Sequence, residues 1–366
     1  MRIGVNALYL IPGGVGGTET YLRALLSALA QIDAVNEYFV FTNRETDTAL
    51  VPKQANFHHQ PQGVRAVNRV ARLLWEQTML PLAARKLRLD VWFNPGFTSP
   101  IFSGTPQVTV FHDLQHKRHP EYFRWFDLPG WNFFLYWSAR RARTVLADSN
   151  ATAADLDRFY GLRGPKVRIV PLGVGAEFFA LASHRKNPER FVLAVSTLHP
   201  HKNLDGLMRA FAIFRKTHPD YRLVVCGLHG FFTEQLRGLR DQLGLTGSVE
   251  FPGWIPRAEL HQLYAHAMAF VYPSRFEGFG LPVLEALAAG VPSACSRVEP
   301  LDSIAGHAAL KFDPDRPAEI AECMERLVTD STLRERLAAA GRARAAQFTW
   351  RATAEATLAA LTQAGE

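Results

Sequence analysis

Residues 267–292 read A-M-A-F-V-Y-P-S-R-F-E-G-F-G-L-P-V-L-E-A-L-A-A-G-V-P, and this stretch decides the fold. The apolar run Ala267–Val271, bounded by turn residues, predicts a buried strand. The glycines that follow prevent regular structure, Pro282 suits the first turn of a new helix, and Gly290 ends that helix. A strand, a glycine-rich loop and a helix in succession are typical of a parallel α/β sheet.

Two acids lie within this frame. Glu277 is in the glycine-rich loop, and Glu285 is one turn into the predicted helix. On one unbroken helix they would stand ~12 Å apart, but the break lets both carboxylates face a pocket above the strand's carboxyl end, where open α/β sheets bind ligands. The helix start at Leu281–Val283 adds N–H groups suited to phosphate. This predicts a ligand with hydroxyls and phosphates; the alternative is a surface loop with two solvated glutamates.

Composition limits the class of protein. With 366 residues, 48% hydrophobic and 20% charged, the sequence predicts a globular protein of two domains. No apolar run approaches the ~20 residues that span a bilayer, and the start lacks the basic segment of a signal peptide. Three cysteines without paired spacing indicate a reduced, cytoplasmic compartment. The net charge of +7 favours anionic partners, but no helix presents a base-reading basic face, so nucleic acid is not expected.

Alternating strands and helices predict two Rossmann-like domains facing each other across a cleft. We expect the first domain at residues 1–175, a linker near Gly173–Pro188, and the second domain at 189–349. The strands expected in the first domain are Ile3–Leu8, Tyr38–Phe41, Val91–Phe93, Val108–Val110, Thr144–Ala147 and Val167–Val170. Those expected in the second are Phe191–Val195, Arg222–Cys226, Val249–Phe251 and Ala269–Tyr272.

The first glycine loop, Pro12–Thr18, follows the first strand and precedes an amphipathic helix. Its Gly16 and Gly17 would let the backbone approach a phosphate or a sugar hydroxyl closely. A tight turn without any ligand remains the alternative. The spacing does not match a dinucleotide-binding fingerprint.

A β-branched strand ends in His112 and Asp113, which places an imidazole and a carboxylate at its carboxyl end. We expect His112 to point into the cleft between the domains. A metal site that adds His116 and His119 is an alternative, but H-x3-H-x2-H fits no zinc pattern well. A purely structural histidine is the other. No metal or cofactor is expected.

Two further stretches of the first domain allow more than one interpretation. Phe123–Arg143 is rich in aromatic residues and ends in arginines, so it could lie on an acidic membrane surface, line an apolar acceptor site, or form a core helix with solvated arginines. Ser149 lies where a strand gives way to a helix and can cap that helix, although a position in the cleft is the alternative.

In the second domain, the loop V-S-T-L-H-P-H-K-N, residues 195–203, follows a strand and leads into a helix. Lys202 in this loop is a natural cation for a diphosphate, and a solvated lysine is the alternative. The backbone at Trp254 and Ile255, after another strand, could contact a nucleobase edge. A turn with Trp254 packed inward is the equal alternative.

These motifs occur together in one order: G-G-V-G-G-T-E, V-F-H-D-L, A-D-S-N-A-T, L-H-P-H-K-N, P-G-W-I-P-R-A-E-L and E-G-F-G-L-P-V-L-E, with F-T-W ending at Trp350. As a set they resemble the retaining nucleotide-sugar glycosyltransferases of family four, which have the glycosyltransferase-B fold. The resemblance implies that a last helix, residues 350–366, crosses back onto the first domain. It also implies which residues bind the donor. Lys202 would bind the diphosphate, Glu285 the ribose, and Trp254 and Ile255 the base, while Gly16, Gly17 and Ser196 would also contact the donor. Glu277, with Gly278, Phe279, Gly280 and Leu281, would bind the transferred sugar, His112 would lie near the reacting carbon, and Asp113 and Ser149 would lie toward the acceptor.

The resemblance further implies transfer of a hexose with retention, from a nucleotide sugar to a glycan or lipid-linked acceptor in surface polysaccharide assembly. The H-x-K-N motif and the W-E-Q stretch at Trp75–Gln77 are similar to those of enzymes that use GDP-mannose, while UDP-sugars remain open. The family often has arginine where His201 stands here, which leaves the phosphate charge less fully balanced. A sugar-nucleotide epimerase and a non-catalytic nucleotide-sugar binder are the rival functions. A cytoplasmic location is expected, with contact at the inner membrane face, if any, through Trp131–Arg143.

Overall fold

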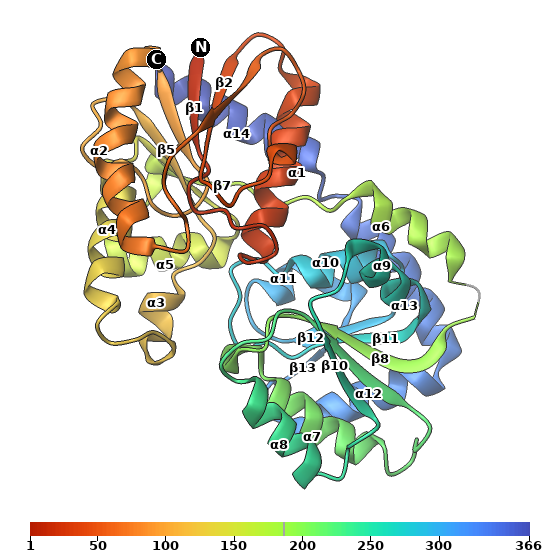
Figure 1. The fold of residues 1–366 in the computed structure, drawn as a ribbon. Coiled ribbons are helices and arrows are strands. Elements are labelled where there is room, and N and C mark those ends of the chain that lie inside the picture. Colours follow the sequence, from red (N-terminus) through yellow and green to blue (C-terminus); the bar gives the residue numbers. More distant parts are fainter. Residues whose placement is uncertain (186) are drawn as a thin grey trace. The chain divides into compact units, whose positions relative to one another are not determined.

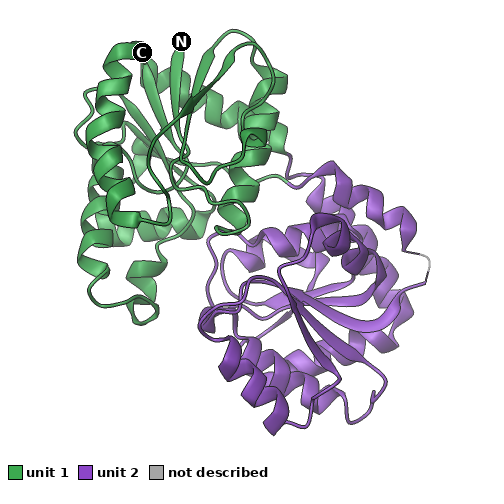
Figure 2. Ribbon diagram, in the orientation of Figure 1, with its two compact units in different colours: residues 1–173, 350–366 green, residues 174–349 purple. Residues whose placement is uncertain are grey.

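The computed structural model describes residues 1–185 and 187–366, and the chain divides into two compact units (Figure 2). Unit 1 comprises Met1–Gly173 and Trp350–Glu366, and unit 2 comprises Val174–Thr349. Each unit is a Rossmann-like α/β domain built on its own parallel sheet. The expected linker near Gly173–Pro188 is wrong in part, because it contains a helix at Ala176–Leu181; residue 186 lies outside the described residues.

The sheet of unit 1 has seven parallel strands in the order β3-β2-β1-β4-β5-β6-β7. Their bounds are β1 (Arg2–Asn6), β2 (Glu37–Thr42), β3 (Phe57–Pro61), β4 (Val91–Asn94), β5 (Gln107–Phe111), β6 (Thr144–Ala147) and β7 (Val167–Ile169). The helices are α1 (Gly17–Ile32), α2 (Arg69–Leu87), α3 (Gln115–Arg118), α4 (Leu128–Arg141), α5 (Asn150–Tyr160) and α14 (Trp350–Gly365).

The strand order assigns the long helices of unit 1 to two faces. Crossovers between parallel strands are right-handed, so connections that progress in opposite directions along a sheet place their helices on opposite faces. The connections through α2, α4 and α5 all progress toward β7, whereas the one through α1 progresses toward β3. Accordingly α2 and α4 lie on one side of the sheet and α1 on the other, where α14 packs against it (Figure 1).

The sheet of unit 2 has six parallel strands in the order β10-β9-β8-β11-β12-β13. Their bounds are β8 (Glu189–Val195), β9 (Arg222–Cys226), β10 (Val249–Gly253), β11 (Ala267–Tyr272), β12 (Ser293–Ser296) and β13 (Leu310–Phe312). The helices are α6 (Ala176–Leu181), α7 (Leu204–Phe214), α8 (Thr233–Gln242), α9 (Arg257–His266), α10 (Leu281–Ala288), α11 (Leu301–Ala305), α12 (Pro317–Thr329) and α13 (Ser331–Ala345).

The central strands are buried on both faces, as a parallel sheet covered by helices requires. In β11 the side chains of Ala269, Phe270 and Val271 are fully buried, and in α7 Phe211 packs against this core. Burying each large apolar side chain contributes roughly 1.5–3 kcal/mol relative to leaving it exposed. Continuous apolar strands therefore fix the sheet, and the polar loops that follow them gather at its carboxyl edge.

Every strand and helix expected from periodicity is confirmed, with bounds that differ by up to two residues. The short elements that were not expected include the helices α3 (Gln115–Arg118), α6 (Ala176–Leu181) and α11 (Leu301–Ala305) and the strands β3 (Phe57–Pro61) and β13 (Leu310–Phe312). Both strands lie at an edge of their sheet, where one neighbour is missing and fewer side chains must be apolar. Their sequences, F-H-H-Q-P and L-K-F, carry too little hydrophobic pattern to be recognised.

Candidate active site

The centre of the sheet in unit 2 is a topological switch point. From β8 the chain continues to β9 and β10 on one side, while β11, the neighbour of β8, continues to β12 and β13 on the other. Open α/β sheets bind ligands at such a switch point, beside the loops that leave the carboxyl ends of the strands. Residues 196–203 and 273–280 form the loops after β8 and β11.

Lys202 and Glu277 meet at this point. Lys202 Nζ lies 2.6 Å from Glu277 Oε1 and 3.4 Å from the Tyr272 hydroxyl, which ends β11. The two charged side chains are only 14% and 9% exposed, so the pair is held largely away from water. A buried cation beside the loops at a switch point can exchange its carboxylate partner for an anionic ligand. The structure thus brings together two of the three residues expected to be catalytic.

Backbone and amide contacts hold the two loops against each other. The buried Asn203, which follows Lys202, adopts a left-handed conformation with φ 54°. Its amide donates to the carbonyl oxygens of Pro273 and Pro314, at 3.1 and 2.7 Å. The carbonyl of His201 accepts hydrogen bonds from the Arg275 N–H at 2.8 Å and the Ser274 hydroxyl at 3.2 Å. His201 therefore contributes its backbone to the joint between the loops.

The start of α10 faces the same loop. Gly280 precedes the helix with φ 107°, and a Cβ added there would stand 2.4 Å from Leu301 Cδ2, so only glycine fits this turn. Gly280 is the N-cap residue of α10 and, as a glycine, has no side chain to cap the first turn. Phe279 and Leu281 are only 5% and 9% exposed, so both side chains are buried beneath the loop surface. The Phe279 ring makes an edge contact with the ring of Phe348. A helix start without a capping side chain is suited to an anion.

Glu285 lies in the second turn of α10 and accepts a hydrogen bond of 3.0 Å from the Tyr264 hydroxyl. Burial raises the pKa of Glu285 to about 7, against the opposing effects of the Tyr264 hydrogen bond and the positive charge of Arg257. Both Glu277 and Glu285 contribute, after burial, to raising the pKa of Tyr272. The two acids thus both act on the tyrosine that ends β11, while their direct partners differ: Lys202 for Glu277 and Tyr264 for Glu285.

Ser196 directly follows β8, and its hydroxyl is a polar group whose partner the described residues do not supply. Its side chain is 9% exposed, and its Oγ has no hydrogen-bond partner within the described residues. Beside it, Gly227 at the end of β9 has φ 149°, and an added Cβ would stand 2.0 Å from the Ser196 carbonyl oxygen. The loops after β8 and β9 therefore approach as closely as a glycine allows, next to an unsatisfied hydroxyl that a ligand could engage.

Trp254 and Ile255 follow β10, at the edge of the sheet and two strands away from β8. The Trp254 side chain is 61% exposed, so the alternative in which it packs inward is wrong. Gly253, just before it, lies against the loop after β9, since a Cβ there would stand 3.2 Å from His229 Nε2. These residues lie on the β10 side of the switch point.

In unit 1 the first glycine loop links β1 to α1. Gly16 is the last residue before α1 and has φ 58° and ψ −130°, while Gly17 opens the helix. No atom lies within 4 Å of a Cβ built on Gly16, so the turn leaves open space there. The loop is braced by Glu19, whose carboxylate accepts a 2.7 Å hydrogen bond from the Gly13 N–H. The backbone is therefore rigid but accessible at Gly16.

His112 follows β5 and is held from both sides. Its Nδ1 lies 2.6 Å from Asp148 Oδ2, at the end of the neighbouring strand β6, and its Nε2 lies 2.9 Å from the Pro95 carbonyl oxygen. Burial by itself lowers the pKa of His112, but the Asp148 carboxylate and the Pro95 carbonyl outweigh it and raise the pKa. Because both nitrogens face acceptors, the arrangement favours a charged imidazolium that donates twice. In this structure the ring has no nitrogen left to act as a base.

The two residues expected toward the acceptor have local partners. Asp113 Oδ1 accepts a 2.9 Å hydrogen bond from the Gln115 N–H at the start of α3. Ser149 Oγ accepts from the Thr152 N–H at 3.1 Å, so it caps α5, which was one of its two interpretations. Thr152 Oγ1 in turn donates to the His112 carbonyl at 3.1 Å. Both side chains thus set the loops around His112.

The other two histidines of this stretch have different neighbours. His116 lies 2.8 Å from the Tyr160 hydroxyl, and burial lowers its pKa to about 4. His119 lies 2.9 Å from Glu121. The structure describes no group of three or more His, Cys, Asp or Glu side chains, in residues 1–185 and 187–366, that could hold a metal ion.

The W-E-Q stretch has structural contacts. Trp75 Nε1 donates to Gln62 Oε1 at 3.0 Å, and the fully buried Glu76 accepts from Asn6 and Thr98 at 3.1 and 2.9 Å. Gln77 binds the loop after β4 through backbone groups of residues 99 and 101, both at 2.8 Å. These side chains secure α2 to the sheet, so the stretch carries no direct information on the nucleobase.

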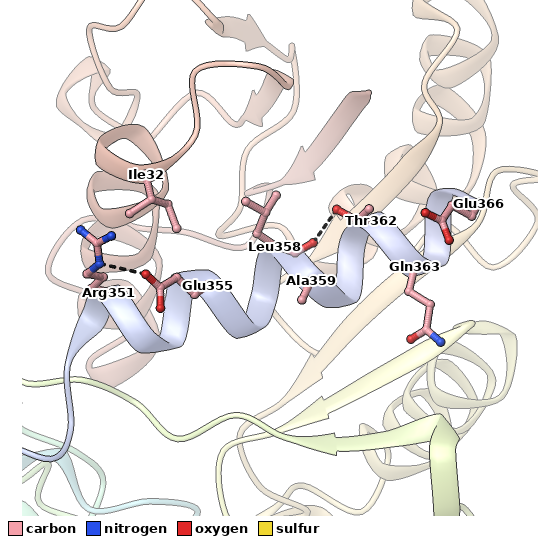
Figure 3. A pocket seen from close by; sticks show the side chains of 8 residues that line it. All are labelled: Ile32, Arg351, Glu355, Leu358, Ala359, Thr362, Gln363 and Glu366. Atoms are coloured by element: carbon pink, nitrogen blue, oxygen red, sulfur yellow. Dashed lines mark hydrogen bonds and ion pairs between the residues drawn. The ribbon is translucent and has the colours of Figure 1, made fainter.

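A surface hollow of about 520 Å³ lies along α14 in unit 1 (Figure 3). It is lined by Ile32, Arg351, Glu355, Leu358, Ala359, Thr362, Gln363 and Glu366. Arg351 and Glu355 form an exposed i,i+4 ion pair of 2.8 Å, which suits a solvated helix face. None of the expected site residues lies in this hollow, so it is separate from the candidate active site.

Sequence reasoning missed the partners that orient the site: Tyr264, Tyr272, Asp148 and Gly227. None of them was singled out as a site residue, although Tyr272 stands in the stretch 267–292. Asp148 was part of the quoted A-D-S-N-A-T motif, and adjacent strands β5 and β6 could have suggested that it meets His112. The tyrosines could be found only after the register of α9 and β11 was known.

The chain matches two family models that together cover most of its length. Residues 178–344 match "Glycosyl transferases group 1", and residues 15–178 match "Glycosyltransferase Family 4". O-antigen chain mannosyltransferase B of Escherichia coli is 30% identical, with 73% of each chain covered. D-inositol 3-phosphate glycosyltransferase of Acidothermus cellulolyticus is 33% identical, over 98% of this chain and 89% of that protein. Anabaena HepE, solved with UDP and glucose, has a TM-score of 0.77 and 19% identity, with 99% of both chains covered.

Proposed function

Because the chain belongs to glycosyltransferase family 4 and has the glycosyltransferase-B fold, we propose that it transfers mannose from GDP-mannose, with retention, to a glycan or lipid-linked acceptor in surface polysaccharide assembly. One observation carries the proposal at the site. The buried pair of Lys202 and Glu277 stands at the switch point between β8 and β11, beside a helix start without a capping side chain. The choice of mannose is supported by the Escherichia coli mannosyltransferase, which is 30% identical.

Lys202 and Glu277 exchange partners when a donor binds. The diphosphate takes the place of the Glu277 carboxylate at Lys202 Nζ, since the negative charge of two phosphates outweighs that of one carboxylate. Glu277 is then free to accept hydrogen bonds from hydroxyls of the transferred sugar. Without donor the two charges neutralise each other, which keeps a partly buried lysine and glutamate from standing unpaired.

Glu285 and Ser196 are assigned to the nucleoside half of the donor. A carboxylate accepts hydrogen bonds from the two ribose hydroxyls, with the Tyr264 hydroxyl fixing one of its oxygens. The unsatisfied Ser196 Oγ is available for a phosphate or ribose oxygen. The base is assigned to the backbone at Trp254 and Ile255, which lie on the β10 side of the switch point.

The chemical step is a front-face displacement. The bond between the anomeric carbon and the phosphate oxygen breaks, the sugar passes through an oxocarbenium-like state, and the acceptor hydroxyl attacks the same face. The leaving phosphate takes the acceptor's proton, so no protein base is needed. Lys202 and the start of α10 stabilise the charge that develops on the diphosphate. His112, with both ring nitrogens facing acceptors, contributes a positive charge and a fixed loop rather than proton transfer.

The proposal is tested by calorimetric titration with GDP, UDP, ADP and their sugar conjugates. We expect GDP and GDP-mannose to bind best and Glu285→Gln to weaken them. Preference for UDP would overturn the donor and leave the class intact. Binding of none of the nucleotides would overturn the function.

Product analysis then separates the rival enzymes. Incubation with donor and a mannose-terminated glycan should give a glycan lengthened by one α-linked hexose, with the anomeric configuration read by NMR. Release of an altered free sugar without acceptor would identify an epimerase instead. Tight donor binding without any turnover, across a panel of acceptors, would favour a binding module.

A further inference from the structure

Two helices of unit 1 leave an unusual amount of apolar surface in solvent. On α2 the side chains of Val70, Leu74 and Leu82 are 69%, 62% and 55% exposed. On α4, Phe133 and Trp137 are 49% and 38% exposed. The spacing i, i+4 within each helix places these side chains along one outward stripe. The two helices cover the same face of the sheet (Figure 1). Because the exposed side chains of each helix lie on the side away from the sheet, we expect both stripes to face the same solvent side.

Contacts between the segments join the two stripes into one surface. At the start of the helices, the Arg69 guanidinium lies 4.9 Å from the centre of the Trp131 ring and 3.6 Å from Asp127. Further along, the loop after β4 bonds to α2 through Gln77 and to α4 through the Ser138 hydroxyl. This loop adds Phe102, which is 69% exposed. We call the exposed residues of α2, α4 and this loop the α2–α4 face.

The aromatic surface continues before α4. Trp125 and Phe126 immediately precede the helix and are 79% and 57% exposed, in edge contact with each other. Burying such side chains in the molecule itself would have been favourable by roughly 1.5–3 kcal/mol each. Contiguous exposed apolar side chains of this extent are typical of a surface that meets a partner.

The charges on the α2–α4 face have one sign. The exposed charged residues of the two helices are all basic: Arg69, Arg85, Lys86, Arg140 and Arg141. The one acid within them, Glu76, is fully buried. Apart from Arg69, none of the five forms an ion pair within the described part of the chain. Arginines and lysines thus lie at the ends of an aromatic and aliphatic stripe and face solvent without acidic partners.

We propose that the α2–α4 face docks the protein on an anionic lipid surface. Aromatic and aliphatic side chains enter the boundary between headgroups and acyl chains, while the basic residues contact lipid phosphates. Charge complementarity selects this occupant over a second copy of the chain. A two-fold dimer through this face would set its five basic side chains against five more, and the one acid beside them, Asp127, already pairs with Arg69. The inference does not rest on the choice of donor, because the α2–α4 face lies wholly in unit 1.

The docking is peripheral. Within residues 1–185 and 187–366, no helix joins enough length to enough apolarity to cross a bilayer. Each basic residue near an anionic surface strengthens binding about fivefold, so binding should fall steeply with salt. The apolar side chains add a contribution that salt does not remove.

The test is sedimentation of the full chain with vesicles of phosphatidylcholine alone, or with about one-third phosphatidylglycerol. We expect binding to the anionic vesicles only. The triple variant Arg85→Gln, Lys86→Gln, Arg141→Gln should lose at least about tenfold in affinity. Its matched control is Arg209→Gln, Lys216→Gln, Arg336→Gln, which removes the same charge from exposed positions of unit 2 and should bind as the native chain does.

A second variant separates the apolar contribution. Phe102→Ser with Phe133→Ser removes two exposed rings, and it should abolish the binding that persists in high salt. Circular dichroism and nucleotide titration of each variant verify that both units remain folded. Equal losses in the two charge variants, or no binding of the native chain to anionic vesicles, would overturn the proposal. So would a solution dimer that the Phe102 and Phe133 changes dissociate.

Discussion

Lys202 Nζ and Glu277 Oε1 stand 2.6 Å apart, on loops that leave two adjacent strands and are separated by 75 residues of sequence. The lysine is thus already paired in this structure. Under the proposed function, a donor diphosphate would have to replace the Glu277 carboxylate at Lys202, so donor binding should be sensitive to both residues. Glu277 would then have a lysine as its partner before binding and a sugar hydroxyl after it.

Replacing Lys202 by methionine should lower turnover by roughly 10²–10³, the scale expected when one preorganised contact to a developing charge is lost. The change also leaves Glu277 without its cation in a site that is mostly buried. Steady-state kinetics measure the effect, and Lys216→Met, at an exposed position of the same unit, is the control. Turnover of Lys202→Met close to that of the native enzyme would contradict the assignment.

Nucleotide binding should depend on pH through Glu285. Because burial raises the pKa of Glu285 to about 7, this carboxyl is protonated at lower pH and then offers ribose hydroxyls one acceptor fewer. Affinity for the nucleotide should therefore increase as pH rises from about 6 to 8. Calorimetry of Glu285→Gln, which cannot ionise, should give weaker binding that is nearly flat over this range. An unchanged pH profile in Glu285→Gln would refute the role.

The raised pKa of Glu285 also makes the stability of the folded protein depend on pH. A carboxyl whose pKa rises on folding contributes stability below its unfolded pKa of about 4.5, and that contribution is lost as pH rises through about 7. Between pH 4.5 and pH 7, the melting temperature of the Glu285→Gln protein should thus fall less than that of the native protein. Thermal unfolding followed by circular dichroism, in the absence of nucleotide, separates this effect from binding.

His112 should titrate above its ordinary range and stabilise unit 1 while charged. The raised pKa means that its contribution is complete below about 6.5 and is lost as pH rises through the higher folded-state value. Asp148→Asn removes the carboxylate charge that raises the pKa of His112 but keeps an amide that can still pair with Nδ1, so the imidazole should titrate lower than in the native protein. NMR titration of the imidazole and thermal unfolding measure both effects. A His112 that titrates below 6.5 in the native protein would exclude the imidazolium.

Gly227→Ala should disrupt the donor site through the backbone. The new Cβ would stand 2.0 Å from the Ser196 carbonyl, at a φ of 149° that only glycine tolerates well. We expect a lower melting temperature together with loss of nucleotide binding. Gly238→Ala is the matched control, because Gly238 lies within α8 and no atom is within 4 Å of its added Cβ. That change should stabilise the protein by about 0.5–1 kcal/mol.

The sequence predicts the architecture well where a strand is continuous and apolar. Ala267–Val271 and the helix that begins at Leu281 could be placed because turn residues and apolar periodicity agree over this stretch. Edge strand β3 (Phe57–Pro61) could not, since histidine and glutamine occupy its middle and its pattern resembles a loop. Helix α6 was not recognised within the expected linker, because a helix of six residues is too short to show a hydrophobic periodicity.

The candidate site was predictable in its residues but not in their pairing. That Lys202 and Glu277 both follow strands could be read from the sequence, while their contact depends on β8 and β11 being neighbours. His112 was expected as a group open to the substrate, and its two partners at 2.6 and 2.9 Å follow from where β6 and the loop after β4 lie. Long-range contacts of this kind are set by strand order, which local patterns do not encode.

Helix α14 packs with α1, and its Thr353 hydroxyl donates to the Pro171 carbonyl at 2.8 Å, so unit 1 is assembled from two separate stretches of chain. Unit 2, in contrast, is continuous from Val174 to Thr349. A ribosome therefore synthesises the whole of unit 2 before it reaches the helix that covers α1. During that interval unit 2 can fold on its own, while the apolar side of α1 that α14 later covers stays open to solvent and to chaperones.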